Sequence, residues 1–423
     1  MLAEKISGTH VGLWLLIPEH VRLGTWDLLS AWTGIHDPQA INPRLALQLV
    51  HESALCVNGV RQRRTLRQKG FETLNGLPFV ATDTAIHKLL DQHTMKESLS
   101  LQEALGHIRY LHGHYPGNLI LIDPHRIRTW SKRHMPPKKK KDSDTASKVM
   151  QTFFAIDGTS SQPLGCGIGS STVTVTHATL RLVDHLATIV PNDALLVADA
   201  EHFTVEILHS LVQHPQFTFL IPAPRHKRLL KKISTLPFKP LWAGYAVAES
   251  TYEITGIDTP LRVIAQRTGE REDAFEYKPF VTSSTIPADE LMTLIFPDRW
   301  NIEEFFNTEC YLGWNRASTF NLNIRSGKLS LALIAQAAIY QLRQKLPDDL
   351  NRWTANSIAQ KLFSGIDGDI RVKNDTIIVT LYNMPYDNFF KEHYEHLPQK
   401  LEAEGLNPKI PWLYNFKVDF KFK

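Results

Sequence analysis

Apolar residues in the first part of the chain recur three or four places apart, which is the spacing of one face of a helix. The pattern predicts a helix over residues 43–57 and a second helix whose N-cap is Thr82 or Asp83. A third helix is expected to open at Ser100, because Ser100 and Glu103 have the spacing of a capping box. The chain is therefore expected to begin with a helical domain.

From residue 118 the pattern changes to short apolar runs of the kind that form buried strands. Two of these runs, NLILID and ALLVAD, each end in an aspartate, and Asp157-Gly158 between two further runs is typical of a hairpin turn. In chain order the segments are strand 118–123, strands 149–157 and 162–170, helix 176–190, strand 194–199, helix 203–214 and strand 217–224. This order predicts an α/β fold in which helices cover a mixed sheet.

Alternating polar and apolar residues over 236–286 predict a β-rich insertion after that sheet. Helical patterns return at 298–312 and at 328–345. The tail combines helices near 353–363 and 387–404 with a hairpin and a last strand. On one face of that last strand we expect Phe416, Val418, Phe420 and Phe422.

Three domains follow from these patterns. They are a helical N-terminal domain over 1–117, an α/β domain with the β insertion over 118–345, and a small α+β C-terminal domain over 346–423. The length of 423 residues agrees, since about 150 residues per domain gives two or three domains.

Composition excludes several classes of protein. Hydrophobic residues make up 43% and charged residues 21%, so the chain is neither disordered nor fibrous. No apolar run reaches the roughly 20 residues that span a bilayer, and we expect no membrane association. The N-terminus lacks the features of a signal peptide. Three scattered cysteines exclude a disulfide framework and favour a reducing cytoplasm.

The net charge is only +4, but positive residues gather in three clusters. Residues 61–69 and 225–232 each hold five positive side chains and no acidic one, and residues 126–148 hold nine against two aspartates. Solvated loops would explain any single cluster, whereas three clusters favour a surface that binds a polyanion. Candidate phosphate contacts are Lys138, Lys139, Lys140, Lys141, Arg225, Lys227 and Arg228. For the four lysines, a flexible basic loop is an equally good interpretation.

Asp123 and Asp199 are the candidate catalytic residues with the clearest physical basis. Each ends an apolar strand, and side chains at the carboxyl ends of neighbouring strands project into one crevice of an α/β sheet. Two carboxylates brought together there repel each other unless a proton or a cation is shared between them. Hard oxygen ligands of this kind suit Mg²⁺ or Mn²⁺. A third carboxylate, Glu303, lies one helical turn after Arg299, so both could reach a phosphate–metal site.

The two strand–aspartate segments and RWNIEEFF together resemble the DDE transposases of bacterial insertion sequences, which have a ribonuclease H-like catalytic core. The chain is more similar to the subgroup with a tyrosine–arginine–glutamate–lysine signature on the glutamate helix and a β insertion before it. Here the four signature positions are Phe296, Arg299, Glu303 and Cys310, so the arginine and the glutamate match, whereas the tyrosine and the lysine do not. The resemblance covers residues 118–345.

This resemblance implies a transposase that cuts and rejoins double-stranded DNA at the ends of its own insertion sequence. Asp123, Asp199 and Glu303 would hold two Mg²⁺ ions, or Mn²⁺ in their place, and Arg299 would contact phosphate near the scissile bond. The positive clusters would bind the DNA backbone, and the N-terminal helices would recognise the element ends. A homodimer on DNA, in the bacterial cytoplasm at the nucleoid, is also implied.

Several alternatives stay open on sequence alone. Asp157 competes with Asp123 as the first catalytic aspartate, but Asp-Gly is common in hairpins for backbone reasons, and a ribonuclease H-like order places the aspartate on the strand before the hairpin. Trp300 could stack on a displaced base or pack in the core. Glu304, Glu309, His125 and His202 are interpreted as surface residues.

Three different functions also compete with one another. A nuclease that hydrolyses DNA without strand transfer would need the same three acids as a transposase. An inactive, DNA-binding relic of a transposase would retain the fold and the positive clusters. The N-terminal helices fit a DNA-binding domain and a plain helical bundle equally well.

Overall fold

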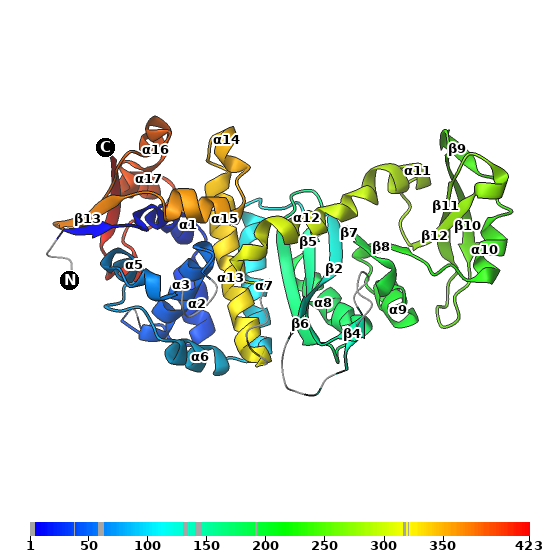
Figure 1. The fold of residues 1–423 in the computed structure, drawn as a ribbon, viewed down its shortest axis with the longest axis horizontal. Helices are drawn as coiled ribbons and strands as arrows, with labels where there is room; N and C mark the ends of the chain where they lie inside the picture. Colours follow the sequence, from blue (N-terminus) through cyan, green and yellow to red (C-terminus); the bar gives the residue numbers. More distant parts are fainter. Residues whose placement is uncertain are drawn as a thin grey trace. The chain divides into compact units, whose positions relative to one another are not determined.

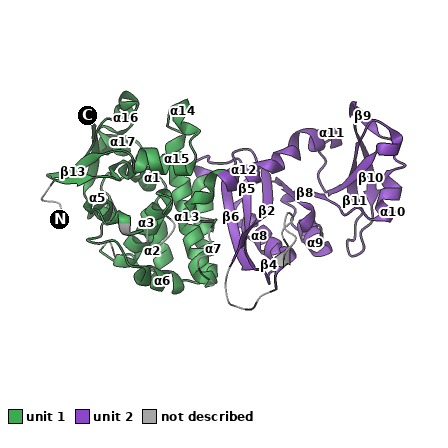
Figure 2. Ribbon diagram, in the orientation of Figure 1, with its two compact units in different colours: residues 1–109, 308–423 green, residues 110–307 purple. Residues whose placement is uncertain are grey.

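The computed structural model describes residues 5–37, 39–57, 63–129, 134, 136–139, 146–190, 193–315, 319 and 321–423. The chain divides into two compact units (Figure 2). Unit 2 is the continuous segment Tyr110–Asn307, and unit 1 combines Met1–Arg109 with Thr308–Lys423. The division differs from the predicted domain ranges, because the segment after residue 307 belongs with the two ends of the chain.

One mixed sheet forms the centre of unit 2. In the described part of the chain it has nine strands in the order β6-β5-β2-β7-β8-β12-β11-β10-β9 (Figure 1). Their bounds are β2 Leu119–Arg128, β5 Val149–Asp157, β6 Pro163–Ser170, β7 Ala194–Ala198, β8 Phe217–Pro222, β9 Lys239–Trp242, β10 Tyr245–Tyr252, β11 Leu261–Thr268 and β12 Glu276–Thr282. Strands β2, β7 and β8 are parallel. Strand β5 runs antiparallel to β2, and β6 forms a hairpin with β5 and so runs in the same direction as β2. The predicted α/β class and mixed sheet are confirmed.

Helices cover this sheet because its strands are apolar on both faces. Helices α8 (Val175–Ile189) and α9 (Val205–Gln213) pack on one face against buried residues of β2, β7 and β8. On the opposite face, Phe154 of β5 contacts the helix that contains Glu303. A short helix, α10 (Lys227–Ile233), follows β8. A separate two-stranded ladder pairs β3 (Lys138–Lys139) with β4 (Ala146–Ser147).

The predicted β insertion is present, but it is not a separate sheet. Strand β12 pairs antiparallel with β8 through Phe280–Thr282, so β9 to β12 extend the central sheet beyond β8. The pairing satisfies backbone groups that would otherwise form an exposed edge of β8.

The helix predicted over 298–312 begins ten residues earlier than expected. Its first turn is α11 (Ala288–Glu290), followed by a π-helical turn over Leu291–Ile295 and a 3₁₀ turn over Pro297–Trp300. Helix α12 (Asn301–Glu309) then completes it. Pro297 has no N–H, so the helix lacks one backbone hydrogen bond at this point. The irregular turns on either side of Pro297 accommodate this loss.

Unit 1 is mainly helical, with a small sheet. Its helices are α1 Ile17–Arg22, α2 Thr25–Thr33, α3 Ile41–Ala54, α5 Lys69–Leu74, α6 Asp83–Asp91, α7 Met95–Leu111, α13 Leu322–Arg343, α14 Asp348–Asn351, α15 Ala355–Ile358, α16 Asp387–Tyr394 and α17 Leu397–Ala403. Helix α13 packs against α3 and is buried on nearly all sides. This burial explains why α13, predicted within the 118–345 domain, belongs to unit 1.

The sheet of unit 1 joins the two ends of the chain. Its order is β1 (Ile6–Gly8), β13 (Gly368–Lys373), β14 (Thr376–Leu381) and β15 (Lys417–Phe422). The three-residue strand β1 is too short to give a period in the sequence and was not predicted. The buried face expected for the last strand is confirmed at Val418, Phe420 and Phe422. The predicted helix 387–404 is two helices, because His396 has a φ of 59° and interrupts it.

Helix starts test the capping predictions directly. Thr82 caps α6 as predicted, accepting a hydrogen bond from the amide of Ala85. The capping box at Ser100 was wrong, because α7 already begins at Met95. Its capping box is Thr94 with Glu97: Glu97 N donates to Thr94 Oγ1 at 3.2 Å, and Thr94 N donates to Glu97 Oε2 at 2.6 Å.

Replacing Thr94 by alanine is expected to lower the free energy of unfolding by about 1 kcal/mol, because its hydroxyl no longer accepts from Glu97 N or donates to Glu97 Oε2. Ser100→Ala, at the rejected position inside the same helix, should change it by less than about 0.5 kcal/mol. Urea denaturation followed by circular dichroism measures both variants. Equal losses would contradict the observed helix start.

Among the described residues, no helix combines the length and the apolar sequence that crossing a membrane requires.

Candidate active site

Asp123 and Asp199 lie side by side on two neighbouring parallel segments of the sheet. Strands β2 and β7 are paired in register up to Ile122 and Ala198, and the aspartates are the next residues of the chain. Strand β7 ends at Ala198, whereas β2 continues to Arg128, so the predicted strand end at Asp123 was wrong. The carboxyl ends of parallel strands are the usual place for binding crevices in an α/β sheet. The structure therefore brings together the two aspartates that the strand pattern selected.

The charge around Asp123 is strongly negative. The pKa of the Asp123 carboxyl is raised to about 7, mainly by burial and also by the neighbouring carboxylates of Asp199, Glu303 and Glu201, whereas the Arg299 guanidinium acts in the opposite direction. These contributions place all three predicted acids, and one that was not predicted, within electrostatic reach of one another.

Glu303 reaches this group from helix α12. The apolar side of the helix, Ile302, Phe305 and Phe306, is buried as predicted. The Phe154 ring lies 5.6 Å from that of Phe305 and 5.5 Å from that of Phe306, between ring centroids. Aromatic packing of this kind fixes the helix on the sheet and leaves the Glu303 side chain 40% exposed.

Arg299 and Glu303 lie on one side of the helical run, as their spacing predicted. Arg299 Nη2 is 3.5 Å from Glu303 Oε1. The guanidinium also lies over the Trp300 ring, 5.4 Å from its centroid. Arg299 is thus held beside the carboxylates by an ion pair and a cation–π contact.

Asp157 lies away from the acids, at the last residue of β5 and three residues beyond Phe154, the partner of Asp123. It pairs with Ile120, three residues before Asp123 along β2. Its buried carboxylate accepts hydrogen bonds from the amides of Thr159, Ser160 and Gly117 and from the Ser160 hydroxyl. Four donors occupy this carboxylate, so its role in the structure is to form the hairpin turn.

The chemistry of the donors fits a hard divalent cation. Among the described residues, no three His, Cys, Asp or Glu side chains stand close enough to hold one ion as they lie here. Asp123, however, lies among carboxylates at a site whose burial disfavours negative charge, and a cation would neutralise that charge. Carboxylate oxygens are the ligands that Mg²⁺ and Mn²⁺ prefer.

Residues 114–337, more than half of the chain, match the family described as the transposase DDE domain. The chain belongs to this family. A comparison with curated proteins gives no match. Among solved structures, the chain is similar to a piggyBac transposase in a synaptic complex with hairpin DNA, determined by cryo-electron microscopy. The two are 11% identical with a TM-score of 0.44, over 85% of this chain and 82% of that chain.

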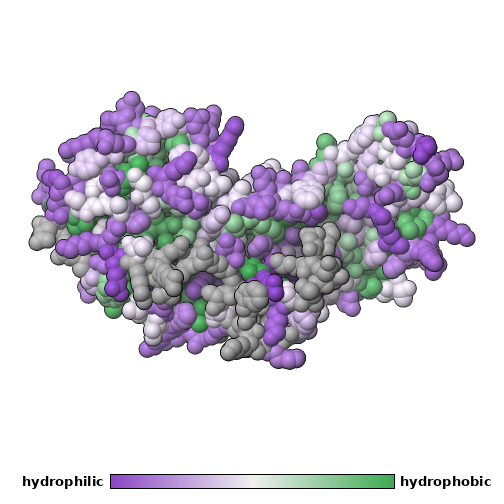
Figure 3. All heavy atoms as spheres, viewed as in Figure 1, coloured by the Kyte–Doolittle hydropathy of each residue, from purple (hydrophilic) through white to green (hydrophobic). Residues whose placement is uncertain are grey.

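Several candidate DNA contacts of this DDE transposase are on its surface. Trp300 is 62% exposed, so the core-packing interpretation is wrong. Arg225, Lys227 and Arg228 are exposed at the start of α10, and the face of unit 2 visible around this helix is mainly hydrophilic (Figure 3). Lys138 and Lys139 form β3, whereas Lys140 and Lys141 lie outside the described residues.

Phe296 and Cys310, the two positions at which the sequence differs from the signature it resembles, lie in different units. Phe296 packs its ring against Phe280, 4.7 Å between centroids, and Lys278 Nζ lies 4.9 Å from the Phe296 centroid. Cys310 belongs to unit 1, where burial raises the pKa of its thiol. Phe296 therefore has an aromatic packing role in unit 2.

Two residues interpreted as surface groups are buried. His202 is fully buried, which lowers the pKa of its ring to about 4, and its Nδ1 lies 2.9 Å from Thr179 Oγ1. Glu309 is 5% exposed and pairs with Arg343 at 2.6 Å. The sequence did not predict this burial, because both residues are polar and polar residues are usually exposed. Glu304 is exposed as predicted.

Sequence reasoning also missed three polar residues around the acids of the transposase domain. Arg126 forms an ion pair with Glu201, two positions after Asp199. Asn301 Nδ2 donates to the carbonyl of Gly158 at 3.0 Å, which ties the start of α12 to the hairpin turn. Only the nearness of Glu201 to Asp199 was visible in the sequence.

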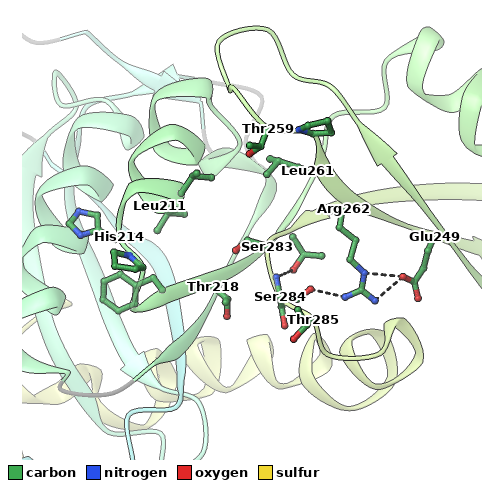
Figure 4. A pocket seen from close by; sticks show the side chains of 15 residues that line it. Leu211, His214, Thr218, Glu249, Thr259, Leu261, Arg262, Ser283, Ser284 and Thr285 are labelled. Carbon is green, nitrogen blue, oxygen red and sulfur yellow. Dashed lines mark hydrogen bonds and ion pairs between the residues drawn. The ribbon is translucent and has the colours of Figure 1, made fainter.

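A pocket of about 720 Å³ in unit 2 is not lined by the candidate site acids Asp123, Asp199 and Glu303 (Figure 4). It opens beside the first residues of β8, at the opposite end of the parallel strands from Asp199. Arg262 crosses it and donates to Glu249 and to the carbonyl of Ser284 (Figure 4). It also donates to the carbonyl of Ile286. These bonds connect β10, β11 and the segment after β12, so we assign Arg262 a structural role.

Proposed function

We propose that this transposase cleaves DNA strands at the ends of an insertion sequence and joins them to target DNA. One observation carries the proposal: Asp123 and Asp199 directly follow the paired segments of the adjacent parallel strands β2 and β7, and Glu303 approaches them from a helix that aromatic packing fixes on the sheet. The order β6-β5-β2-β7-β8, with β2, the first strand of unit 2 along the chain, in the middle, supports a ribonuclease H-like core.

In this proposal Asp123, Asp199 and Glu303 hold two Mg²⁺ ions, for which Mn²⁺ can substitute. When bound, the ions activate the attacking water or 3′-hydroxyl and stabilise the leaving oxygen. Arg299, positioned by Trp300 and Glu303, contacts a phosphate oxygen near the scissile bond through its N–H groups. Trp300 is exposed next to Arg299 and can stack on a displaced base.

DNA binding is assigned to the positive clusters and to the N-terminal helices. Arg225, Lys227, Arg228 and Lys138–Lys141 contact backbone phosphates, and the helices recognise the element ends. The protein acts as a homodimer on double-stranded DNA, at the nucleoid in the bacterial cytoplasm.

The test supplies pre-cut element ends, Mg²⁺ and a target plasmid. Joined products support the proposal. Cleavage of intact ends without joined products would identify the hydrolytic nuclease instead, and no metal-dependent nicking by a folded protein that binds DNA would identify the inactive relic.

Salt dependence tests the phosphate contacts. Each phosphate contact that is lost reduces the slope of log affinity against log salt by about 0.9. Replacing Arg225, Lys227 and Arg228 together by glutamine should therefore reduce this slope by about two to three, as measured by fluorescence anisotropy with labelled DNA in chelator.

The matched control replaces three exposed lysines of unit 1, Lys409, Lys421 and Lys423, by glutamine. The control removes the same charge outside the cluster, so its slope should equal that of the parent. If both triple variants gave the same slope of log affinity against log salt, Arg225, Lys227 and Arg228 would not contact DNA.

A further inference from the structure

The segment that carries Asp199 is folded back on itself. Asp199 caps a short 3₁₀ turn over Ala200–His202, and its Oδ1 accepts a hydrogen bond from the amide of Glu201 at 2.5 Å. The amide of His202 donates to the Asp199 carbonyl at 3.1 Å. The direction of the Asp199 carboxylate is therefore set by the position of this turn.

Arg126 holds the turn from the side of the neighbouring strand. Arg126 Nη1 donates to Glu201 Oε1 at 2.9 Å, and Nη2 donates to the other carboxylate oxygen. The fork is bidentate, which fixes both distance and orientation. Arg126 lies on β2 three residues after Asp123, so it joins the strand of one aspartate to the turn of the other.

Arg126 is itself anchored to the sheet. Its Nε donates to Oε1 of Gln151, the residue opposite it on β5, at 3.1 Å. Gln151 is buried, and its Nε2 donates to the carbonyls of Ser170 and Val173 at 2.9 and 3.1 Å. The Arg126 guanidinium is therefore held in place by hydrogen bonds that involve three strands, β2, β5 and β6.

A second contact fixes the other end of the turn. His202 is buried and lies 2.9 Å from the Thr179 hydroxyl of α8 through its Nδ1. The turn is therefore held at two points, by the contact of His202 with α8 and by the ion pair of Glu201 with Arg126. Of these two contacts, the one with Arg126 connects the turn to β2, the strand of Asp123.

We propose that Arg126 and Glu201 are a positioning pair that sets the separation of Asp123 and Asp199, and thereby the affinity of their metal site. The inference rests on the proposed function, since it concerns the same two aspartates. Partners that orient metal ligands typically change metal affinity by about 10- to 100-fold when they are removed.

The pair also has two simpler interpretations, which the variants separate. If Glu201 were itself a metal ligand, Glu201→Gln would weaken metal binding and Arg126→Gln would not. If only charge mattered, Arg126→Gln would strengthen binding, Glu201→Gln would weaken it, and the double variant, which keeps the net charge, would equal the parent.

The experiment measures Mn²⁺ binding to the full chain without DNA, by electron paramagnetic resonance of the free ion. Positioning predicts that Arg126→Gln, Glu201→Gln and the double variant each lose about tenfold or more in affinity, and that the two losses are not additive. Arg126→Lys keeps the charge and one bond to Glu201, so it should restore part of the affinity. Parent-like binding by the double variant, or by Arg126→Gln, overturns the inference.

Two controls complete the measurement. Arg262→Gln with Glu249→Gln removes another Arg–Glu pair of unit 2, outside the site, and should leave Mn²⁺ affinity unchanged. Asp199→Asn should remove most of the binding. If Asp199→Asn bound Mn²⁺ like the parent, the metal site and the proposed function would both be wrong, whereas loss in Asp199→Asn with none in the double variant rejects only the positioning pair.

Discussion

Asp199→Asn is expected to lower the rate of DNA cleavage by about 10³-fold or more while leaving DNA affinity in chelator unchanged. The variant keeps the shape of the side chain but removes one negative charge from the proposed metal site. A loss of about 4 kcal/mol of transition-state stabilisation corresponds to that rate change. Cleavage of a labelled end fragment in Mg²⁺, beside a binding assay without metal, measures the two quantities separately.

Neighbouring glutamates on α12 provide the matched control for this prediction. Glu303→Gln should behave like Asp199→Asn, because Glu303 lies in the field of Asp123. Glu304→Gln makes the same chemical change at the next, exposed residue and should retain the cleavage rate of the parent. Full cleavage by Asp199→Asn, or loss in Glu304→Gln with Glu303→Gln active, contradicts the assignment of the acids.

Asp157→Asn is expected to have its large effect on stability. The buried carboxylate accepts four hydrogen bonds, and the amide can neither carry the charge nor accept at both ends. Bonds to a charged acceptor contribute about 1.5 to 3 kcal/mol each, so we expect the free energy of unfolding to fall by about 3 kcal/mol or more. Guanidinium denaturation measures this loss.

The same variant distinguishes the two candidate first aspartates. Folded Asp157→Asn protein should cleave DNA at close to the parent rate at low temperature, since the hairpin turn lies away from Asp123. Asp258→Asn, at an exposed loop position of the same unit, should change stability by less than about 0.5 kcal/mol. A stable Asp157→Asn protein without cleavage activity would restore Asp157 as the catalytic candidate.

The sequence was most informative where function depends on strand order. Asp123 and Asp199 could be selected because each ends an apolar run, and parallel strands place such residues at one edge. Arg126 could not be selected, because it lies beyond Asp123, where the apolar run in the sequence stops. Strand β2 continues past Asp123, and this continuation brings Arg126 to its partner.

Other errors came from signals that are local and common. The motif Ser100–Glu103 has the same spacing as the true capping box six residues earlier, and only the full helix distinguishes them. His202 and Glu309 were assigned to the surface because they are polar, although each has a partner in the interior. Strand β1 is recognisable only once β13, more than 350 residues later, provides its pairing partner.

The division of the chain imposes an order on its synthesis. Unit 2 is continuous and interrupts unit 1, whose strand β1 pairs with β13 and whose helix α3 packs against α13. At about 5 to 20 residues per second, the first strand waits roughly 20 to 70 s on the ribosome before its partner is made. The sheet of unit 2 can assemble during that interval, whereas the apolar faces of the N-terminal helices stay uncovered. The nascent N-terminal segment is therefore the part of this transposase that we expect chaperones to bind.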